Sequence, residues 1–357
     1  MHLLILTKDL SDNSTGRAHV IWQLARHLGW TTEVVAPTGA ELWRPLADSD
    51  FAANSRVVAR RSRASRAELE DAARRADLVI AVKPVPGSLD RGMRLSRVTN
   101  TPLLLDIDDP DLESRTGEGR PLEALAKAVL RPTSFWPSVW FRRRVSAFPV
   151  IVSNPVLQRR YGGTIIPHAR ADFGDGVPHT RTSPVVAFVG TVRKNKGLSE
   201  VRAAVANLQN LGFRLVVTDD PPDDAREWEE WSGPSTLEEG RRIVQAADIV
   251  VLVSDPRMAH SRGQLPAKLV DAMVAGRAIV VSDLEPMVWA TGGASRVANA
   301  GTPGELDAAL TALVDPELRS RLGALARHEA RDRFEVSVVA RSFREACESA
   351  LMSGRKR

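Results

Sequence analysis

The sequence lacks the cysteine pairs, the long hydrophobic runs and the pattern of a cleavable leader that mark disulfide-bonded, membrane-spanning and secreted proteins. It contains one cysteine, Cys347, which excludes an intramolecular disulfide and a zinc site built from cysteines. Its longest aliphatic runs, such as Ile249 to Val253, are far shorter than the run needed to cross a bilayer. The apolar stretch from Met1 to Leu6 is short and has no small-residue cleavage site. It therefore predicts a first strand rather than a signal peptide.

Net charge and glycine spacing exclude two further classes. Lys and Arg number 49 against 44 Asp and Glu, so the net charge is only +5 and both signs are dense. A dedicated nucleic-acid binder concentrates positive charge on one face, so we expect no nucleic-acid partner. The G-x-G-x-x-G fingerprint is absent, which argues against an NAD or FAD enzyme. We expect a cytoplasmic protein whose small positive excess suits an anionic ligand or an anionic membrane surface. The high Arg and Ala content is typical of a GC-rich bacterial genome.

The chain length and the hydrophobic pattern predict the architecture. A chain of 357 residues is too long for one ordinary core and indicates two domains. Continuous Val, Ile and Leu runs are typical of parallel strands buried on both faces, with helices between them. One such helix is predicted from Arg17 to Leu28, before Gly29. The predicted strands are Leu3–Leu6, Glu33–Ala36, Arg56–Ala59, Leu78–Val82, Leu103–Asp106, Val150–Ser153, Val185–Val189, Arg214–Thr218, Ile249–Val253 and Ala278–Ser282.

This pattern predicts an α/β fold with two Rossmann-like, doubly wound parallel-sheet domains facing a cleft. The linker is expected within Ala169 to Pro184, which is rich in Gly, Pro, Thr and Asp. A cleft between two such domains is a common setting for a small-ligand site.

Two loops after predicted strands could bind an anion. In the first, Ser14, Thr15 and Gly16 allow a tight turn before a helix, whose free N–H groups favour an anion. The alternative is an ordinary capped loop. In the second, Gly190 turns the chain, and Arg193, Lys194 and Lys196 follow. Cations at the carboxyl end of a parallel strand suit a diphosphate, and the alternative is a solvated basic turn.

The segment Gly263 to Asp283 carries the most specific pattern. Pro266 suits the start of a helix and Gly276 its end. Lys268 and Asp271 then project from neighbouring points of its first two turns. The helix N-terminus would supply backbone donors for a phosphate, and the carboxylate could accept hydrogen bonds from ribose hydroxyls. The alternative is a surface Lys–Asp pair on a packing helix.

These segments resemble group-one, retaining glycosyltransferases of the GT-B fold. Their donor-binding helix has the pattern P-x-K-L-x-E-x-M-A-x-G-x-P-V-V. The matching residues here are Pro266, Lys268, Leu269, Met273, Gly276 and Val280, with Asp271 and Ile279 as close substitutes. Further similar segments are Phe188-Val189-Gly190 with Lys196-Gly197 (the phosphate loop), Val152-Ser153, Ile166-Pro167 and Ala247-Asp248-Ile249.

The resemblance implies both a domain plan and a reaction. It implies an acceptor domain at 1–178, a nucleotide-sugar donor domain at 179–335, and a C-terminal helix at 336–357 that returns to the first domain. The implied enzyme is a hexosyltransferase-like glycosyltransferase in glycan biosynthesis. It moves a sugar from a nucleoside diphosphate sugar to a hydroxyl of a glycan, a lipid-linked acceptor or a small molecule. Retention, no metal and no cofactor beyond this co-substrate are the family expectations.

The resemblance also implies roles for particular residues. Arg193 and Lys196 would neutralise the diphosphate leaving group, Asp271 would hold the ribose, and the loop before the donor helix would face the sugar. The chain departs from the family at Gly263, where a Glu is usual, and at Thr191, where an Arg is usual. The predicted donor-binding residues are Gly16, Gly190, Arg193, Lys196, His260, Arg262, Gln264, Leu265, Lys268 and Asp271.

The string Asp106 to Asp111 follows a predicted strand, in a region where the family usually carries a His. Asp106 and Asp108 are the predicted catalytic residues, which would contact the acceptor hydroxyl or accept its proton. A divalent cation held by the carboxylates is a second interpretation. A turn with helix-capping Asp residues is a third.

Aromatic side chains beside a basic run predict a peripheral contact with the inner face of the membrane. The alternative is a core helix with solvated arginines. The residues concerned are Phe135, Trp136, Trp140, Arg142, Arg143 and Arg144.

Two other functions stay open at this point. A noncatalytic sugar-nucleotide-binding protein is consistent with Gly263 and with the acidic string in place of a His. A GT-B sugar-nucleotide epimerase would act on the same donor without an acceptor.

Overall fold

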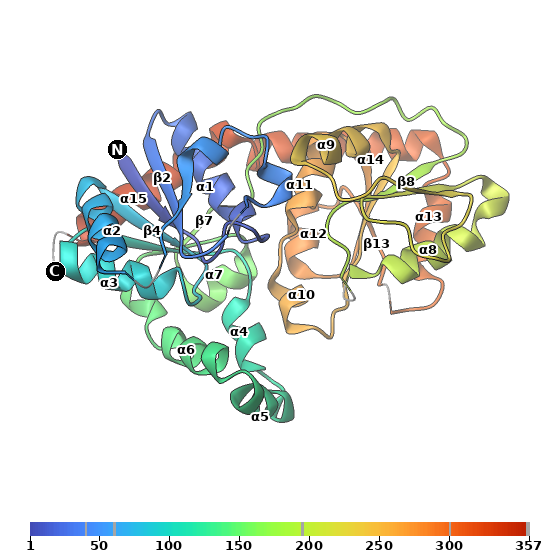
Figure 1. Cartoon of the computed structure of the whole chain (residues 1–357). Coiled ribbons are helices and arrows are strands. Elements are labelled where there is room, and N and C mark those ends of the chain that lie inside the picture. Colours follow the sequence, from blue (N-terminus) through green and yellow to red (C-terminus); the bar gives the residue numbers. More distant parts are fainter. Residues whose placement is uncertain (40, 60–61, 194–195, 300, 355–357) are drawn as a thin grey trace. The chain divides into compact units, whose positions relative to one another are not determined.

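The computed structural model describes residues 1–39, 41–59, 62–193, 196–299 and 301–354 (Figure 1). Backbone contacts divide the chain into two units. Unit 1 comprises Met1–Ala169 with Val336–Arg357, and unit 2 comprises Arg170–Glu335. Each unit is a parallel sheet with helices packed on it. The predicted α/β fold with two Rossmann-like domains is therefore confirmed.

The sheet of unit 1 has seven strands in the order β3-β2-β1-β4-β5-β6-β7. Each strand pairing in it is parallel, and Leu4 of β1 lies between Glu33 of β2 and Val79 of β4. The strands are β1 (His2–Leu6), β2 (Thr31–Ala36), β3 (Ser55–Val57), β4 (Leu78–Val82), β5 (Leu103–Ile107), β6 (Val150–Val152) and β7 (Thr164–Ile165). The strand order reverses direction between β1 and β4, which is where ligands bind in such sheets.

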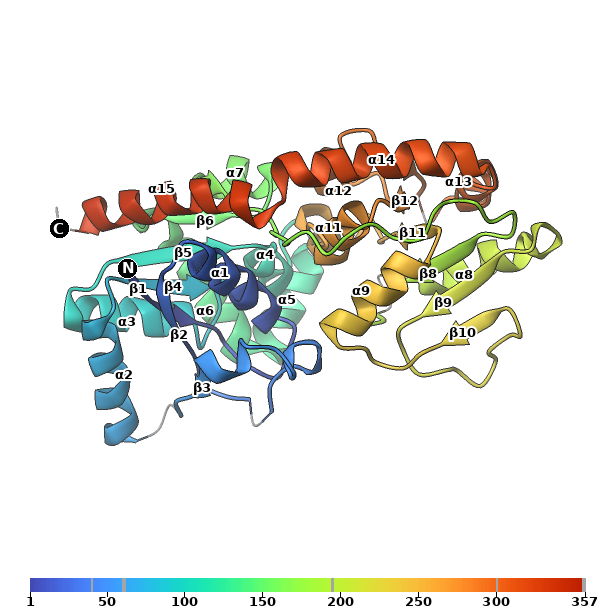
Figure 2. The same cartoon turned by 90° about the horizontal axis from the view of Figure 1, so that it is seen from above.

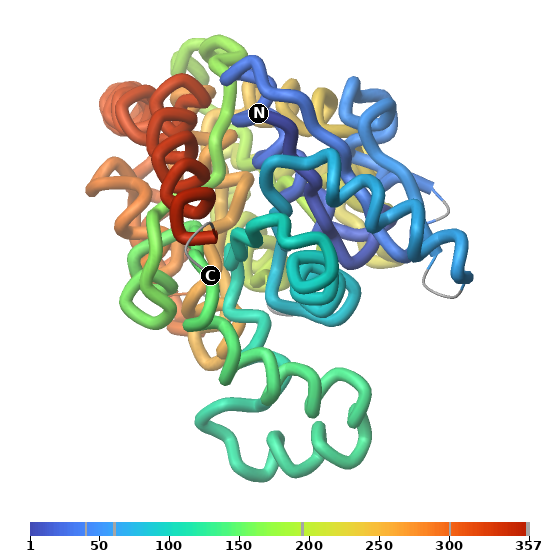
Figure 3. Tube along the Cα trace, turned by 90° about the vertical axis from the view of Figure 1, so that its left-hand side faces the viewer, coloured from blue at the N-terminus to red at the C-terminus, as the bar shows by residue number. Residues whose placement is uncertain are grey.

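Six of the helices described in unit 1 form three pairs, while α4 packs on α5 and α6, and α7 packs on β6 and β7. Helices α1 and α15 pack on each other, as Figure 2 shows, and α15 also contacts β5 and β7. Helices α2 and α3 pair with each other, and α3 contacts β1, β4 and β5. Helices α5 and α6 extend away from the rest of unit 1 (Figure 3). The bounds are α1 (Thr15–His27), α2 (Arg63–Arg75), α3 (Leu89–Thr99), α4 (Asp111–Thr116), α5 (Pro121–Leu130), α6 (Pro132–Arg142), α7 (Pro155–Tyr161) and α15 (Val336–Gly354). Short 3-10 turns lie at Arg44–Leu46, Ala52–Asn54 and Val145–Ala147.

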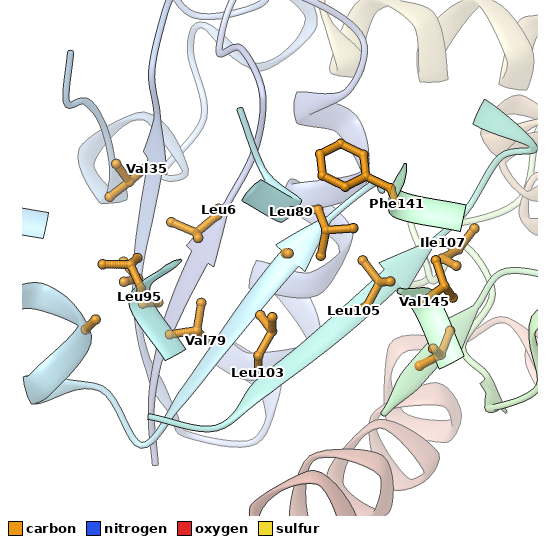
Figure 4. Packing of buried hydrophobic residues seen from close by; sticks show 14 of the residues in the cluster. Leu6, Val35, Val79, Leu89, Leu95, Leu103, Leu105, Ile107, Phe141 and Val145 are labelled. Atoms are coloured by element: carbon orange, nitrogen blue, oxygen red, sulfur yellow. The ribbon is translucent and has the colours of Figure 1, made fainter. Parts of the chain in front are cut away.

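The core of unit 1 explains why its strands read as continuous aliphatic runs. Leu4 and Leu6 of β1 join Val79 of β4 and Leu105 of β5 in one buried cluster. Phe141 of α6 belongs to the same cluster and anchors the base of the projecting helices (Figure 4). The neighbouring residues on these strands are buried as well, because both faces of the sheet are covered.

The sheet of unit 2 has six strands in the order β10-β9-β8-β11-β12-β13, again with parallel pairings. Val186 and Ala187 of β8 enter different buried clusters, so both faces of this sheet are covered too. The strands are β8 (Val185–Phe188), β9 (Arg214–Val217), β10 (Glu229–Trp231), β11 (Ile249–Leu252), β12 (Ala278–Val281) and β13 (Arg296–Val297). The helices are α8 (Leu198–Asn207), α9 (Leu237–Ala246), α10 (Ala259–Gly263), α11 (Ala267–Val274), α12 (Glu285–Thr291), α13 (Glu305–Ala312) and α14 (Pro316–Arg333), with a 3-10 turn at Gln209–Leu211.

The structure corrects one predicted boundary. The sequence placed the first domain at 1–178, but unit 2 begins at Arg170. The intervening segment is bonded to unit 2 rather than free. Arg170 N donates to Phe334 O at 2.9 Å, and Gly176 N donates to Ala275 O at 2.9 Å. The composition of this segment correctly predicted a stretch without regular secondary structure. The sequence did not indicate that the segment is hydrogen-bonded to unit 2.

The predicted strands agree with the structure to within one or two residues at their ends. The short strands β7, β10 and β13 were missed, because two or three residues carry too little pattern. None of the helices that the structure describes combines the length and apolar character needed to cross a bilayer.

Candidate functional site

The carboxyl end of β8 carries the predicted phosphate loop of unit 2. Gly190 adopts φ +122°, a conformation that favours glycine, and its N–H donates to Thr218 Oγ1 at 2.8 Å. Lys196 Nζ donates to Gln264 Oε1 at 2.7 Å. The structure therefore brings together two predicted donor residues from distant parts of the chain. Arg193 is exposed in the same loop, and its carbonyl accepts from Lys196 N at 2.9 Å. Lys194 lies outside the described residues.

Helix α11 holds a buried ion cluster. The Asp271 side chain is 0% exposed, and Arg170 Nε lies 2.5 Å from its Oδ1. Lys268 Nζ lies 3.4 Å from Oδ2 of the same carboxylate. Asp271 is thus part of a packed ion cluster, and its contact with the donor ribose stays a prediction from the resemblance.

The electrostatics of this cluster favour an anionic ligand. Burial alone would raise the pKa of Asp271, but Arg170 and Lys268 outweigh it and hold that pKa well below its usual range. Burial lowers the pKa of Lys268, and Asp271 opposes that effect while Arg170 and Arg241 add to it. Burial also lowers the pKa of Arg241. Three cationic side chains therefore lie around the Asp271 carboxylate, with Glu238 acting on Arg241 as well, and a bound anion would lower the repulsion among them.

The remaining predicted donor residues have different settings. Leu265 is 1% exposed and packs in the core, so only its backbone can face a ligand. His260 and Arg262 lie on the short helix α10, where His260 is partly buried and Arg262 is exposed. Gly16 belongs to unit 1, where a Cβ would stand 3.0 Å from Trp43 Cζ3. The described contacts of Gly16 therefore point to close packing against that ring.

Hydrogen bonds within the loop that precedes α1 end on the Asp12 carboxylate and on backbone carbonyls. Asp12 Oδ1 accepts from Ser14 N at 2.8 Å, and Thr15 Oγ1 donates to Asp9 O at 2.8 Å. Lys8 forms an ion pair with Asp12. The first N–H groups of α1 already donate to backbone carbonyls, Thr15 N to Asp12 O at 3.1 Å and Gly16 N to Asn13 O at 3.2 Å, so the geometry favours the ordinary capped loop.

The carboxyl end of β4 presents a lysine that sequence reasoning missed. Lys83 has φ +68°, which is uncommon for a residue with a side chain. Its Nζ lies 2.9 Å from Asp108 Oδ1, 2.6 Å from Asp109 Oδ2 and 3.1 Å from Asp111 Oδ2. A charged residue directly after a fully aliphatic strand and before Pro84 was the available signal.

Lys83 also bears on the metal interpretation of the acidic string. Asp108, Asp109 and Asp111 could place three carboxylate oxygens around one ion. The Lys83 ammonium contacts all three carboxylates and supplies positive charge at that point. The residues present thus fit an internal ammonium better than a divalent cation.

The two predicted catalytic carboxylates differ in their surroundings. Asp106 is 0% exposed and forms a bidentate ion pair with Arg17. Arg17 Nη2 lies 2.7 Å from Asp106 Oδ1, and Arg17 Nε lies 3.0 Å from Asp106 Oδ2. The same guanidinium donates to Ile166 O at 2.8 Å and Pro167 O at 3.2 Å. Asp106 is therefore a structural ion-pair partner of α1, which leaves Asp108 as the candidate for proton transfer.

Asp108 has the electrostatics expected of such a group. Burial raises its pKa to about 7, with Lys83 opposing the rise and Asp109 adding to it. A carboxyl group that titrates near neutral pH can both hold and release a proton there. Its backbone is fixed as well, since Ser153 Oγ donates to Asp108 O at 2.7 Å.

Helices α5 and α6 expose a row of large apolar side chains. Phe141 is buried and Phe135 is partly buried, whereas Trp136 is 59% and Trp140 43% exposed. The Arg144 guanidinium stacks over the Trp140 ring at 4.9 Å. Helix α5 adds apolar residues that the sequence analysis had not singled out: Leu122 (84% exposed), Leu125 (65%), Val129 (69%) and Leu130 (78%).

Comparisons with known proteins agree with this architecture. Residues 183–315 match the family described as "Glycosyl transferases group 1", and no curated protein sequence matches the chain. Among solved structures, HepE from Anabaena in complex with UDP-glucose is 15% identical, with a TM-score of 0.72 over 98% of this chain and 100% of that chain. Sucrose-phosphate synthase from Thermosynechococcus elongatus is 14% identical, with a TM-score of 0.68 over 99% of each chain.

A third solved structure, the glycosyltransferase WaaG of lipopolysaccharide biosynthesis, is 14% identical, with a TM-score of 0.68 over 97% of this chain and 98% of that chain. At these identities the likenesses show the fold, which is GT-B. Together with the family match in unit 2, they confirm the resemblance to group-one GT-B glycosyltransferases.

Proposed function

We propose, from the group 1 glycosyltransferase match in unit 2 and the GT-B fold of the chain, that this enzyme transfers a hexose from a nucleoside diphosphate sugar to a hydroxyl acceptor. The observation that carries the proposal is the cationic centre of unit 2. Lys268 shares Asp271 with Arg170, and Arg241 adds further positive charge to the cluster. A diphosphate is the anion that such a centre and a nearby Lys196 would bind.

The donor would be held by the loop after β8 and the segment before α11. Lys196 and Gln264 already contact each other, so the lysine is held beside the donor helix. Lys196 and Arg193 would neutralise charge that develops on the leaving diphosphate. HepE has been crystallised with UDP-glucose, which makes a uridine diphosphate hexose the first donor to try.

The acceptor would be activated by unit 1. Asp108 would accept the proton of the attacking hydroxyl, because its pKa of about 7 lets it ionise at neutral pH. We propose transfer with retention and without a metal, since Lys83 fills the centre of the three carboxylates and the cations of unit 2 can bear the leaving-group charge. We also propose that no cofactor is needed beyond the donor itself.

We further propose that α5 and α6 rest peripherally on the inner face of an anionic membrane during glycan biosynthesis. Leu122, Leu125 and Val129 project from α5, with Trp136 and Trp140 on α6. Arg131, Arg143 and Arg144 are exposed on the same segment. Apolar side chains would enter the headgroup boundary while the arginines contact anionic lipids. A lipid-linked acceptor would then be presented at the membrane.

The donor proposal is tested by calorimetric titration of nucleoside diphosphate sugars into the purified protein, with Lys196→Ala as the variant and Lys127→Ala as a matched control. Lys127 lies on α5 of unit 1 and pairs with Glu123. We expect one donor to bind the wild type and the control, and to bind Lys196→Ala at least tenfold more weakly. No binding by the folded wild type would contradict the proposal. Binding without transfer to any acceptor would favour the noncatalytic alternative.

The membrane proposal is tested by co-sedimentation with vesicles. We expect the wild type to sediment with vesicles of phosphatidylglycerol and phosphatidylcholine but weakly with phosphatidylcholine alone. Leu125→Glu with Val129→Glu should abolish this binding. Leu325→Glu is the control, because Leu325 is 49% exposed on α14 of unit 2. Equal binding by the double variant would overturn the proposal, as would self-association of the wild type that the double variant alone removes.

A further inference from the structure

We infer that Asp271 is a positioning residue that holds the Lys268 ammonium for the donor phosphates, in place of binding the donor ribose. The inference rests on the proposed function and concerns the same site. Its test separates the two, because it compares ligands only after the wild type has been shown to bind a nucleoside diphosphate.

The first argument is that both oxygens of Asp271 already face cations inside unit 2. Oδ1 lies 2.5 Å from Arg170 Nε, and Oδ2 lies 3.4 Å from Lys268 Nζ. The Asp271 side chain is 0% exposed, whereas that of Lys268 is 24% exposed. A ribose hydroxyl would have to displace one of these ion pairs and open the packing around α11. The lysine is the member of the pair that a ligand can reach.

The second argument is the shape of the space around Lys268. A Cβ on Gly240 of α9 would stand 3.2 Å from Lys268 Nζ, and a Cβ on Gly190 would stand 3.8 Å from Lys268 Cγ. The lysine stem therefore passes the loop after β8, and its ammonium rests against a glycine of α9. Gly190 and Gly240 thus leave room for the Lys268 side chain. Its ammonium ends at the carboxyl edge of the sheet, where a phosphate would approach.

The third argument is that Arg170 is itself fixed. Its backbone N–H donates to Phe334 O at 2.9 Å, and its guanidinium pairs with Asp271 Oδ1, which leaves Oδ2 to Lys268. Without Asp271, the mutual repulsion of Lys268, Arg170 and Arg241 would lose the carboxylate that opposes it. Lys268 would then turn away or lose its proton, and the phosphate contact would be lost.

The test compares Asp271→Asn with the wild type in calorimetric titrations. The ligands are the nucleoside diphosphate that the wild type binds best, its 2′-deoxy form, and the nucleoside without phosphate. We expect the variant to bind both diphosphates about tenfold to a hundredfold more weakly, by the same factor, and the nucleoside unchanged. If the variant loses only the preference for ribose over deoxyribose, Asp271 binds the ribose and the inference is overturned.

A second variant guards against a folding defect in the first. Gly240→Ala leaves Asp271 and Arg170 in place but crowds the Lys268 ammonium. We expect it to weaken diphosphate binding severalfold with no change in the ribose preference. Unchanged binding by this variant would contradict the described position of Lys268.

The pH dependence of binding gives a third readout. Lys268 faces Asp271 on its own helix, Arg170 from the segment before β8, and Arg241 from α9. Asp271 is the group that favours its protonated form. In Asp271→Asn, the fall of diphosphate binding at high pH should therefore start at a lower pH than in the wild type. An unshifted profile would overturn the inference, since a merely structural loss leaves the profile in place.

Discussion

Each unit of this protein has a lysine at the carboxyl edge of its sheet, buried at Lys83 and 24% exposed at Lys268, and the two lysines differ in the charges around them. Lys83 in unit 1 meets three carboxylates, those of Asp108, Asp109 and Asp111. Lys268 in unit 2 meets one carboxylate, Asp271, which it shares with Arg170. Burial lowers the pKa of both lysines. The three carboxylates outweigh that effect at Lys83 and raise its pKa, whereas at Lys268 the pKa stays lowered.

Under the proposed function, this difference lets two similar sheets serve two kinds of ligand. The surplus of positive charge in unit 2 is offset when an anion binds, which suits a diphosphate. The surplus of negative charge in unit 1 repels a phosphate and is relieved when a carboxyl group takes up a proton, which suits a hydroxyl that gives one away. The parallel sheets are alike, and the assignment of donor and acceptor rests on these few side chains.

The largest expected effect comes from removing the lysine of unit 1. Lys83→Met leaves the buried carboxylates of Asp108 and Asp109 and the partly exposed one of Asp111 without their counter-charge, so we expect a loss of about 3–5 kcal/mol in the free energy of unfolding. Urea denaturation measures it. Lys8→Met is the control, because its pair with Asp12 is 28% and 35% exposed, and it should cost less than about 1 kcal/mol. Equal losses would mean that the Lys83 cluster contributes no more than a surface pair.

A smaller effect should appear as a pH dependence of stability from Asp108. Its pKa is about 7 in the folded protein against a usual value of 3.8, so the folded state binds the proton more tightly than the unfolded state. Protonated Asp108 therefore contributes to the free energy of unfolding at low pH, and this contribution is lost as the pH rises from about 4 to 7. Asp108→Asn should reduce that loss by about 2 kcal/mol. Urea midpoints at pH 5 and pH 7.5 for both proteins measure it, and parallel curves would show that Asp108 ionises normally.

The smallest effect is expected at the rim of the cationic centre in unit 2. Arg241→Met removes one of its charges and should weaken nucleoside diphosphate binding about tenfold, or roughly 1.4 kcal/mol. Arg242→Met on the same helix is the control, because Arg242 is exposed and pairs with Glu238. Calorimetry measures both. If the two variants bind the nucleoside diphosphate equally well, Arg241 plays no part in the anion site. The difference in charge between the two units would then rest on Lys268 without Arg241.

The architecture was predictable because it depends on local pattern. The run Leu78–Val82 is aliphatic at each position and became β4, buried along its whole length. Pro266 and Gly276 bracket α11 as predicted, with the helix running from Ala267 to Val274. These features follow from burial on both faces and from the backbone preferences of proline and glycine.

The candidate site was predictable only in part, because its contacts join residues far apart in the chain. The spacing of Lys268 and Asp271 was visible on one helix, but Arg170 reaches Asp271 from about a hundred residues earlier. Likewise, Asp106 was recognised as a carboxylate after a strand, while its partner Arg17 lies in α1. Sequence spacing reports the neighbours on one element. It does not report which distant cation neutralises a buried carboxylate.

The chain order of the two units has a consequence for biosynthesis. Unit 2 is inserted within unit 1, and its first and last residues, Arg170 and Glu335, are joined by a parallel bridge. On the ribosome, unit 2 is thus fully synthesised before the helix from Val336 to Gly354 emerges. Until then α1 lacks the helix that covers it, with its buried Val339 and Phe343. Unit 1 starts first and finishes last, so a nascent chain that stalls near residue 335 contains all of unit 2 and a unit 1 with an open apolar face.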